Sequence, residues 1–245
     1  MQGLRLNEKK ILITAAANEL GRHLAEYYLQ QGAVVISLDL ATEPIEALKQ
    51  AYPAFISIPC DITQKTEINA AFAQIARESG YVDVLINNAF IRHSEPLFCF
   101  FKQGDRKHHL EAWQSVLDIN LTAPFVISSF FVEQLAQAGR RGVIINLSPA
   151  ASLPGDKAGQ SACEASIAGI RALTRSWSRE LKPLGIRVVS VSPDYMPGGA
   201  GEGEGGVKEE TVLRQAAGKS AITDLVSLAI GHEVMTGNVI ALDGT

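Results

Sequence analysis

The sequence lacks an excess of positive charge and a cysteine-rich motif, and each absence excludes a class of protein. Its 245 residues carry 22 lysines and arginines against 26 aspartates and glutamates, a formal charge of -4, whereas a nucleic-acid-binding surface needs a basic patch. Cys60, Cys99 and Cys163 are too far apart for a metal motif or a disulfide framework. We therefore expect reduced thiols, no metal site and no nucleic-acid partner.

Long apolar runs are also missing. We find no stretch that reads as a membrane span, and the first residues, MQGLRLNEKKILITAA, read as a charged start followed by a strand and not as a signal peptide. These features predict a cytoplasmic protein without a membrane partner. The 47% of apolar and 20% of charged residues are ordinary for a globular chain, whose length suits one large α/β domain.

Short apolar runs alternate with amphipathic stretches along the whole chain. Helical periodicity follows each of KILITA, AVVISLDL, FISIPCDI, VDVLINNAF, GVIINLSPA and IRVVSVSP, and NVIALDG comes last. Strands so continuously apolar are buried on both faces. The alternation predicts one α/β domain over residues 1–245, a doubly wound, seven-stranded parallel sheet with helices on both faces.

A glycine-rich segment, PGGAGEGEGG at residues 197–206, follows the sixth predicted strand. Ordering so many glycines costs conformational entropy, so we expect a mobile loop at the carboxyl edge of the sheet, where ligands bind in this architecture. A lid over a ligand and a plain linker are both open interpretations.

A series of motifs resembles, in order, the landmarks of the classical short-chain dehydrogenase/reductase family. TAAANELG stands at the family's first glycine-rich turn, CDIT at its adenine pocket, INNA on its fourth strand and LDINL on the helix of its catalytic asparagine; GVIINLS, SRELKPLGIRVVSVSP and TGNVIALDG follow. The resemblance runs end to end. It implies a Rossmann-type fold and hydride transfer with a nicotinamide cofactor.

The resemblance identifies a vestigial cofactor site and also departures from it. Glu19 places a carboxylate where the family's turn receives a pyrophosphate, Ala15 replaces a glycine, and Phe90 stands where the family has glycine after INNA. We expect no bound cofactor, with weak NAD binding as the alternative. The retained positions, each of which also has a structural interpretation, are Thr14, Gly21, Asp39, Asp61 and Asn87.

The resemblance implies that the catalytic set is not intact. Aligned through LTRSWSREL, the stretch GQSACEASIAGIRALTRSW puts Cys163 on the family's tyrosine and Ile167 on its lysine. Because no tyrosine lies between Tyr81 and Tyr195, no shift of register restores one. The serine position falls on Pro149, beside Ser148. Asn120 alone is retained, and we interpret it as a structural bridge between helix and strand.

Replacement chemistry has few candidates. Cys163 would act as a nucleophile only with a lowered thiol pKa, so a small buried residue is the simpler interpretation. His93, His108 and His109 lie in a long segment after the fourth strand, and the adjacent His108 and His109 predict a solvated pair instead of joint metal ligands. Tyr195, in SPDYMPGG, lies on a loop expected near the pocket.

The scaffold motifs are kept while the site motifs are lost, which predicts a catalytically silent subunit. Ala165, Ala168, Gly169 and Ala172 lie on the helix that pairs between subunits in the family and would permit close contact. The chain is similar in kind to the non-catalytic subunit of the two-component 2-(α-hydroxybenzyl)succinyl-CoA dehydrogenase. We expect a hetero-oligomer, a tetramer, with an active NAD-dependent relative, or self-association. An oxidoreductase with non-canonical catalytic residues and a nucleotide or metabolite sensor are the alternatives.

Overall fold

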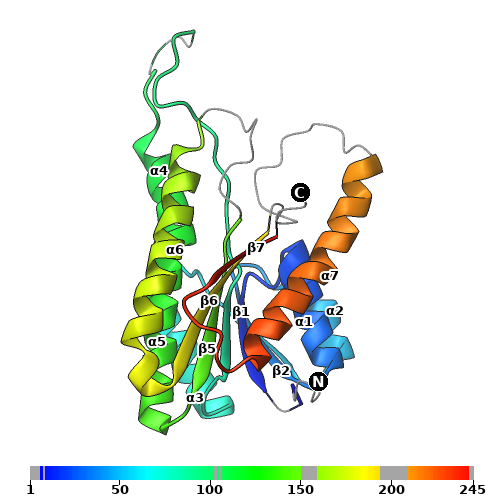
Figure 1. The fold of residues 1–245 in the computed structure, drawn as a ribbon. Coiled ribbons are helices and arrows are strands. Elements are labelled where there is room, and N and C mark those ends of the chain that lie inside the picture. The colour runs from blue at the N-terminus through cyan, green and yellow to red at the C-terminus, as the bar shows by residue number, and fades with distance from the viewer. Residues whose placement is uncertain are drawn as a thin grey trace.

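The computed structural model describes residues 6–7, 9–101, 104, 106–149, 159–193 and 209–242, with the side chains of 209–217 excepted. Seven parallel strands form one sheet in the order β3-β2-β1-β4-β5-β6-β7 (Figure 1). This confirms the predicted doubly wound sheet. The strands are β1 Lys10–Thr14, β2 Val34–Asp39, β3 Phe55–Pro59, β4 Val84–Asn87, β5 Gly142–Leu147, β6 Ile186–Pro193 and β7 Val239–Leu242.

Helices cover both faces of this sheet. One face carries α1 (Glu19–Gln30), α2 (Glu46–Ala51) and α7 (Glu209–Gly231), and the other carries α3 (Lys65–Glu78), α4 (Leu110–Leu117), α5 (Ala123–Ala138) and α6 (Ser161–Glu180) (Figure 1). Short 3₁₀ turns at Glu43–Ile45 and Lys182–Leu184 and a π-helix at Asp118–Thr122 complete the described elements.

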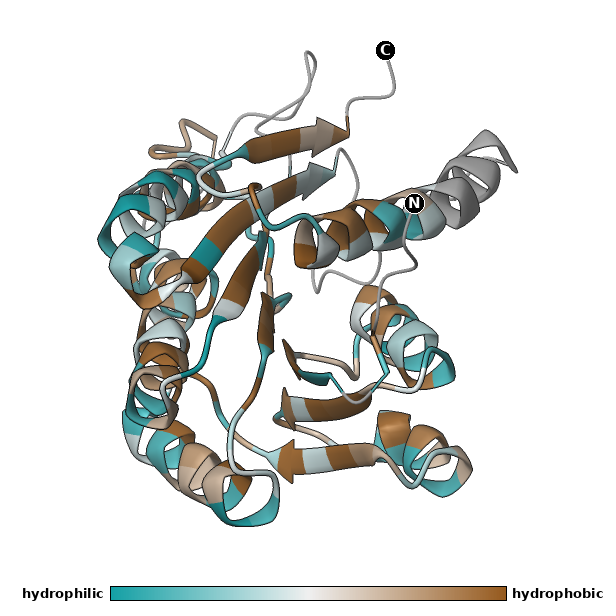
Figure 2. Ribbon diagram, turned by 60° about the horizontal axis from the view of Figure 1, so that its bottom comes forward, coloured by the Kyte–Doolittle hydropathy of each residue, from teal (hydrophilic) through white to brown (hydrophobic). Residues whose placement is uncertain are grey.

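The strands are apolar at successive positions because each face packs on a separate core. On β1, Ile11 and Ile13 belong to the core under α1 and α7, whereas Leu12 belongs to the core under α3, α5 and α6. All three are fully buried, as the alternation of side chains along a strand requires. Figure 2 shows the strands as largely apolar ribbons between amphipathic helices.

One helical stretch corrects the prediction that no apolar run reaches membrane-spanning length. Among the described residues, Leu110–Ala138 is long and apolar enough by length and composition alone, a test that the core helices of soluble proteins also pass. The stretch is long because α4, the π-helix and α5 follow one another without a break. Core packing explains part of its apolar character, since Ile127 and Phe131 are fully buried against the sheet.

The segment between β4 and α4, residues 91–109, projects from the body of the molecule and is called the arm below (Figure 1). Its two sides approach each other, with an antiparallel bridge between Phe98 and Lys107 and a hydrogen bond from the Cys99 N–H to the Arg106 carbonyl oxygen (2.8 Å). Tyr195 and the glycine-rich 197–206 segment lie outside the described residues.

Candidate functional site

The first turn after β1 is fastened to the end of β4. The Thr14 hydroxyl oxygen accepts the N–H groups of Asn88 and Ala89, each at 3.0 Å. The Asn88 amide donates to the carbonyl oxygens of Thr14 (2.9 Å) and Ala15 (3.0 Å). These bonds join β1 and β4 where the strand order reverses, which is where ligands bind in doubly wound sheets.

Two small residues shape this turn. Ala15 has φ = 54°, the left-handed conformation that costs an L-residue roughly 1–2 kcal/mol. Gly21 lies so close beneath the turn that a Cβ there would be 2.3 Å from the Ala15 carbonyl oxygen. Of the two positions that resemble glycines of the family's turn, Gly21 is thus sterically required and Ala15 is strained.

Glu19 begins α1, at the helix end where the family's cofactor phosphates approach. Its carboxylate pairs with the Lys219 ammonium of α7 at 2.5 Å. A carboxylate at a helix N-terminus is also favoured by the helix dipole. Lys219, 200 residues away along the chain, balances the charge of Glu19, and no local sequence pattern links the two residues.

Asp39, at the end of β2, uses only one of its two carboxylate oxygens in a hydrogen bond within the described residues. Oδ1 accepts the Ala17 N–H at 2.8 Å, whereas the buried Oδ2 has no hydrogen-bond partner in the described part of the chain. Burial raises the pKa of this carboxyl group, against the opposing effect of its hydrogen bonds. A buried oxygen without a partner can accept a hydrogen bond from a ligand hydroxyl, and Asp39 is one of the positions that resemble the family's cofactor site.

Asp61 and Asn87 have local structural roles. Asp61 Oδ1 accepts both the N–H and the hydroxyl of Thr63 (2.9 and 2.7 Å) in the turn before α3, while Gln64 occupies the cap position of that helix. The Asn87 amide donates to Asn146 Oδ1 across β4 and β5 at 2.8 Å. Asp61 thus holds the turn but does not cap α3, the structural role that we expected for it, whereas Asn87 joins two strands at the carboxyl edge of the sheet. Asn87 Oδ1 is buried without a hydrogen-bond partner among the described residues.

The two positions on α6 that resemble the family's tyrosine and lysine are buried. Cys163 is 4% and Ile167 is 5% exposed. Cys163 Sγ accepts the His93 N–H at 3.4 Å and lies 3.5 Å from the His93 carbonyl oxygen. Burial raises the pKa of this thiol, which is the opposite of the shift that a nucleophile requires.

Asn120 lies in the π-helix and holds the start of the arm. Its Oδ1 accepts the Ile91 N–H and its Nδ2 donates to the Ile91 carbonyl oxygen, both at 2.9 Å. A weaker bond reaches the Ser166 hydroxyl at 3.3 Å. The predicted bridge exists, but it connects the helix to the segment after β4 instead of to the strand itself.

Arg171 was missed in the sequence, although it lies one turn beyond Ile167 on the same face of α6. Its guanidinium donates to the Ser192 hydroxyl at 3.0 Å and to the Pro149 carbonyl oxygen at 3.4 Å. The buried Ser148 hydroxyl lies 3.5 Å from that same carbonyl oxygen. The i, i+4, i+8 spacing from Cys163 was the available signal.

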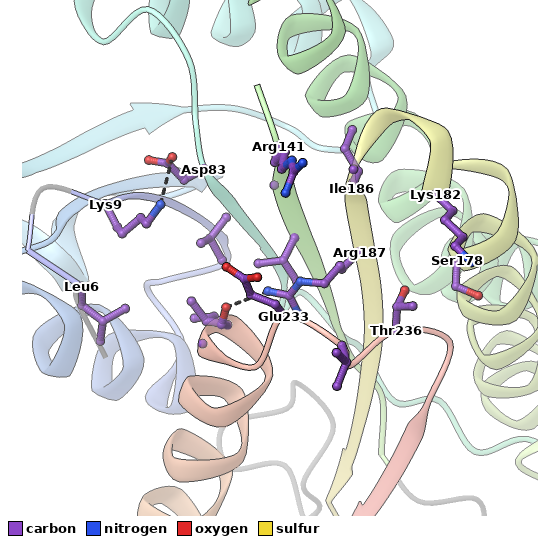
Figure 3. Close-up of a pocket in the computed structure, with 17 residues that line it drawn as sticks. Leu6, Lys9, Asp83, Arg141, Ser178, Lys182, Ile186, Arg187, Glu233 and Thr236 are labelled. Carbon is purple, nitrogen blue, oxygen red and sulfur yellow. Dashed lines mark hydrogen bonds and ion pairs between the residues drawn. The ribbon is translucent and has the colours of Figure 1, made fainter. Parts of the chain in front are cut away.

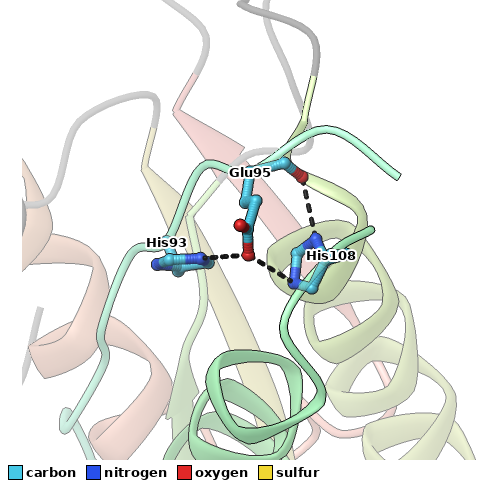
Figure 4. A group of neighbouring side chains, drawn as sticks. All are labelled: His93, Glu95 and His108. Carbon is cyan, nitrogen blue, oxygen red and sulfur yellow. Dashed lines mark hydrogen bonds and ion pairs between the residues drawn. The ribbon is translucent and has the colours of Figure 1, made fainter. Parts of the chain in front are cut away.

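Two histidines and a glutamate gather at the base of the arm (Figure 4). His93 Nε2 lies 3.4 Å and His108 Nε2 3.9 Å from Glu95 Oε2. His109 Nδ1 lies 2.6 Å from Glu95 Oε1. The hydrogen bond from the His109 backbone N–H, followed by the side-chain contacts of His109 and His93, lowers the pKa of Glu95 to about 2. The His108 side chain is 8% exposed, so the predicted solvated pair is wrong for His108, because the arm folds back over its ring.

A cavity of about 1050 Å³ lies at the opposite, amino edge of the sheet (Figure 3). Lys9 pairs there with Asp83 (3.5 Å), and the Arg187 guanidinium donates to the Ala229 and Ile230 carbonyl oxygens at the end of α7 (2.6 and 2.7 Å). These charges already serve the fold, and the cavity is remote from the turn and from Cys163.

Comparison with known proteins identifies the family. The profile of the short chain dehydrogenase family matches residues 9–201. The chain belongs to the short-chain dehydrogenase/reductase family. It is 35% identical to human 3-hydroxyacyl-CoA dehydrogenase type-2 over 188 residues, 74% of this chain and 71% of that protein. It is 29% identical to 3-oxoacyl-(acyl-carrier-protein) reductase FabG of Thermotoga maritima, with 98% of each chain covered.

Solved structures agree on the fold. A short chain dehydrogenase from Leptospira borgpetersenii with bound NAD+ superposes with a TM-score of 0.81 at 23% identity, over 97% of this chain and 92% of that one. A short-chain type dehydrogenase/reductase from Mycobacterium marinum gives 0.79 at 25% identity, over 98% and 96%. The Rossmann-type sheet of this chain is thus a short-chain dehydrogenase/reductase sheet.

The family normally binds NAD(H), and this chain fits such a dinucleotide unevenly. The unsatisfied Asp39 Oδ2 fits a ribose hydroxyl of the adenosine half. The other half meets side chains without the family's hydrogen-bonding groups, since Ile167 is apolar and Phe90 is half-buried against the core under α1. The adenosine side therefore fits and the nicotinamide side does not.

Proposed function

We propose that this chain is a catalytically silent member of the short-chain dehydrogenase/reductase family that assembles with an active, NAD-dependent relative acting on a hydroxyacyl-type substrate. The pair Cys163 and Ile167 carries the proposal. Both are buried, and the sequence resemblance aligns them with the family's tyrosine and lysine. A buried thiol with a raised pKa holds its proton. An isoleucine has no group that could tune or relay one.

The cofactor side supports the same proposal. Glu19 presents a carboxylate where a pyrophosphate would bring more negative charge, and its tie to Lys219 uses the nearby cation. Phe90 packs against the core under α1 instead of leaving room beside β4. We therefore propose that this chain does not turn over a cofactor. Its likeness to the non-catalytic subunit of a two-component dehydrogenase stays a prediction.

Two apolar surfaces support assembly. On α6 the small residues Ala165, Ala168 and Ala172 are exposed in a row, and on α5 the Phe125 ring is 52% exposed. Helices with small residues on the outer face can approach a partner closely. The second surface is the tip of the arm, where large exposed apolar side chains gather: Leu97, Phe98, Phe100 and Phe101.

The test is co-expression of the untagged chain with a tagged, active short-chain dehydrogenase from the same organism. We expect a mixed tetramer by native mass spectrometry and light scattering. Ala168→Arg should split it, because a long charged side chain blocks close helix contact, whereas Glu180→Arg at the end of the same helix should not. A homo-oligomer that ignores such partners, or that oxidises 3-hydroxyacyl-CoA alone, would contradict the proposal.

A nucleotide sensor is a second candidate, and Asp39 Oδ2 is the observation that favours it. Calorimetric titration with NAD, NADH and AMP separates the two candidates. Saturable binding without turnover supports the sensor, provided that Asp39→Ala abolishes this binding. Absence of binding to all three nucleotides supports the partner role. The third candidate is an oxidoreductase with non-canonical residues among Tyr195, Cys163 and Asn120. It predicts turnover that Tyr195→Phe or Cys163→Ala removes.

A further inference from the structure

We infer that His93, Glu95 and His108 form a binding site for a divalent transition-metal ion of the zinc class at the base of the arm. One nitrogen or oxygen atom from each residue lies within 4.8 Å of the other two. The inference stands apart from the proposed function, because it concerns the arm and not hydride transfer.

The spacing of the three atoms fits a tetrahedral ion after a small closure. With bonds of about 2.0–2.1 Å, neighbouring ligand atoms of tetrahedral zinc lie about 3.4 Å apart. Glu95 Oε2 is 3.4 Å from His93 Nε2 and 3.9 Å from His108 Nε2. The contact between Glu95 and His108 would shorten by about half an ångström, and the two histidine nitrogens, which lie within 4.8 Å of each other, would close to the same spacing.

The hydrogen bonding of His108 independently points to a cation. Its Nδ1 lies 2.8 Å from the Glu95 carbonyl oxygen, and because a carbonyl only accepts, Nδ1 must carry a proton. In the neutral ring Nε2 is then a bare lone pair, and it is buried without a hydrogen-bond partner while facing a carboxylate oxygen. Two such groups repel each other unless a cation lies between them.

The surroundings hold the ligands in place as metal sites require. A metal-binding histidine typically donates its other ring N–H to a carbonyl or carboxylate, as His108 does. The His109 N–H donates to Glu95 Oε2 at 2.9 Å, and the Glu95 N–H donates to the Gly159 carbonyl oxygen at 2.8 Å. A Cβ on Gly159 would lie 2.8 Å from the Glu95 carbonyl carbon, so the Gly159 backbone packs directly on the site.

The donor set selects the ion. Two imidazoles and one carboxylate suit Zn²⁺ and its borderline neighbours better than Mg²⁺ or Ca²⁺, which prefer oxygen ligands. Three protein ligands leave a fourth position for water or another small ligand. His93, whose side chain is 37% exposed, borders solvent and gives the ion a route of entry. A bound ion would tie both sides of the arm together.

The test is a titration of the full chain, freed of any histidine tag and treated with chelator, with ZnCl₂ against a competing chromophoric chelator. We expect one Zn²⁺ per chain and a rise in the thermal midpoint. Co²⁺ in place of Zn²⁺ should give the visible absorption of a tetrahedral site. His93→Ala and Glu95→Gln should weaken binding by about 100-fold or more, and His109→Ala, which removes only an orienting contact, by about tenfold.

His232→Ala is the matched control, because this exposed histidine lies beyond α7, away from the arm, and it should bind as the parent does. His93→Ala changes a half-exposed side chain, so it should fold normally and keep the test informative even if His108→Ala does not fold. Absence of binding, or equal affinity in the parent and in His93→Ala, would overturn the inference and leave an ion-paired imidazolium at His108.

Discussion

At the scale of single residues, Ala15 is the one non-glycine residue of the described chain with a positive φ. Glycine adopts this conformation freely but adds entropy to the unfolded state. We therefore expect Ala15→Gly to raise the free energy of unfolding by about 0.5–1 kcal/mol in urea titrations. Ala17→Gly, in the same turn with an ordinary φ, should lower it, and equal losses in both variants would show that φ is not the cause.

Asp39 predicts a pH dependence. Burial raises the pKa of its carboxyl group in the folded state, so the folded chain holds this proton more tightly than the unfolded chain. The resulting contribution to stability is full below the unfolded pKa and is lost as the pH rises through the folded one. The thermal midpoint of Asp39→Asn should therefore exceed that of the parent most at ~pH 7 and only a little at ~pH 4. A difference that grows toward acid would contradict this.

Single residues also mark the limit of sequence reasoning. Neighbouring motifs predict which family site residues Asp39, Cys163 and Ile167 correspond to, because these motifs occur at the family's spacing. The unsatisfied oxygen of Asp39 and the contact of Glu19 with Lys219 depend on packing between distant segments. Neither has a local pattern from which it could be read.

At the scale of elements, the N-terminus of α1 and the end of β4 together restrict the family's cofactor site. Glu19→Gln with Phe90→Gly removes one negative charge and one ring, so we expect NAD affinity to rise by about fivefold to tenfold over the parent in calorimetric titration. Glu26→Gln makes the same charge change further along α1 and should have no effect. An unchanged affinity would show that neither Glu19 nor Phe90 restricts the cofactor site.

Asn120, in the π-helix Asp118–Thr122, should contribute to the stability of the fold through its hydrogen bonds to the arm. Asn120→Ala removes two hydrogen bonds to the part-buried N–H and carbonyl groups of Ile91 and leaves the carbonyl oxygen only its long contact with Cys163 Sγ (3.9 Å). We expect this to cost about 1–3 kcal/mol in urea unfolding. Ser115→Ala removes an exposed bond within α4 and should cost little. A cost for Asn120→Ala as small as that of Ser115→Ala would mean that water replaces its hydrogen bonds to Ile91.

The regular elements followed from sequence far better than the irregular ones. Apolar strands between amphipathic helices have a clear period, so the seven strands and their parallel arrangement in one doubly wound sheet were predictable. A π-helix has no period that distinguishes it from the helices on either side. The arm likewise has no pattern that would indicate how His108 returns to Glu95.

At the scale of the whole molecule, the arm tip should be dispensable for folding and needed for association. Phe100 and Phe101 are 75% and 98% exposed, so we expect Phe100→Ser with Phe101→Ser to change the free energy of unfolding by less than about 0.5 kcal/mol. In the same variant, the isolated chain should bind less of a fluorescent dye specific for apolar surfaces, and its association with the active relative should weaken. A fall in the thermal midpoint would instead place these rings inside the fold.

A chain that offers such aromatic side chains to water has a consequence for its synthesis. Chaperones and proteases recognise exposed apolar segments, and unpaired copies at high concentration aggregate through them. Under the proposed partner role, copies made in excess of the active relative would be degraded or deposited. The ratio in which the two chains are translated would then set how much of either survives.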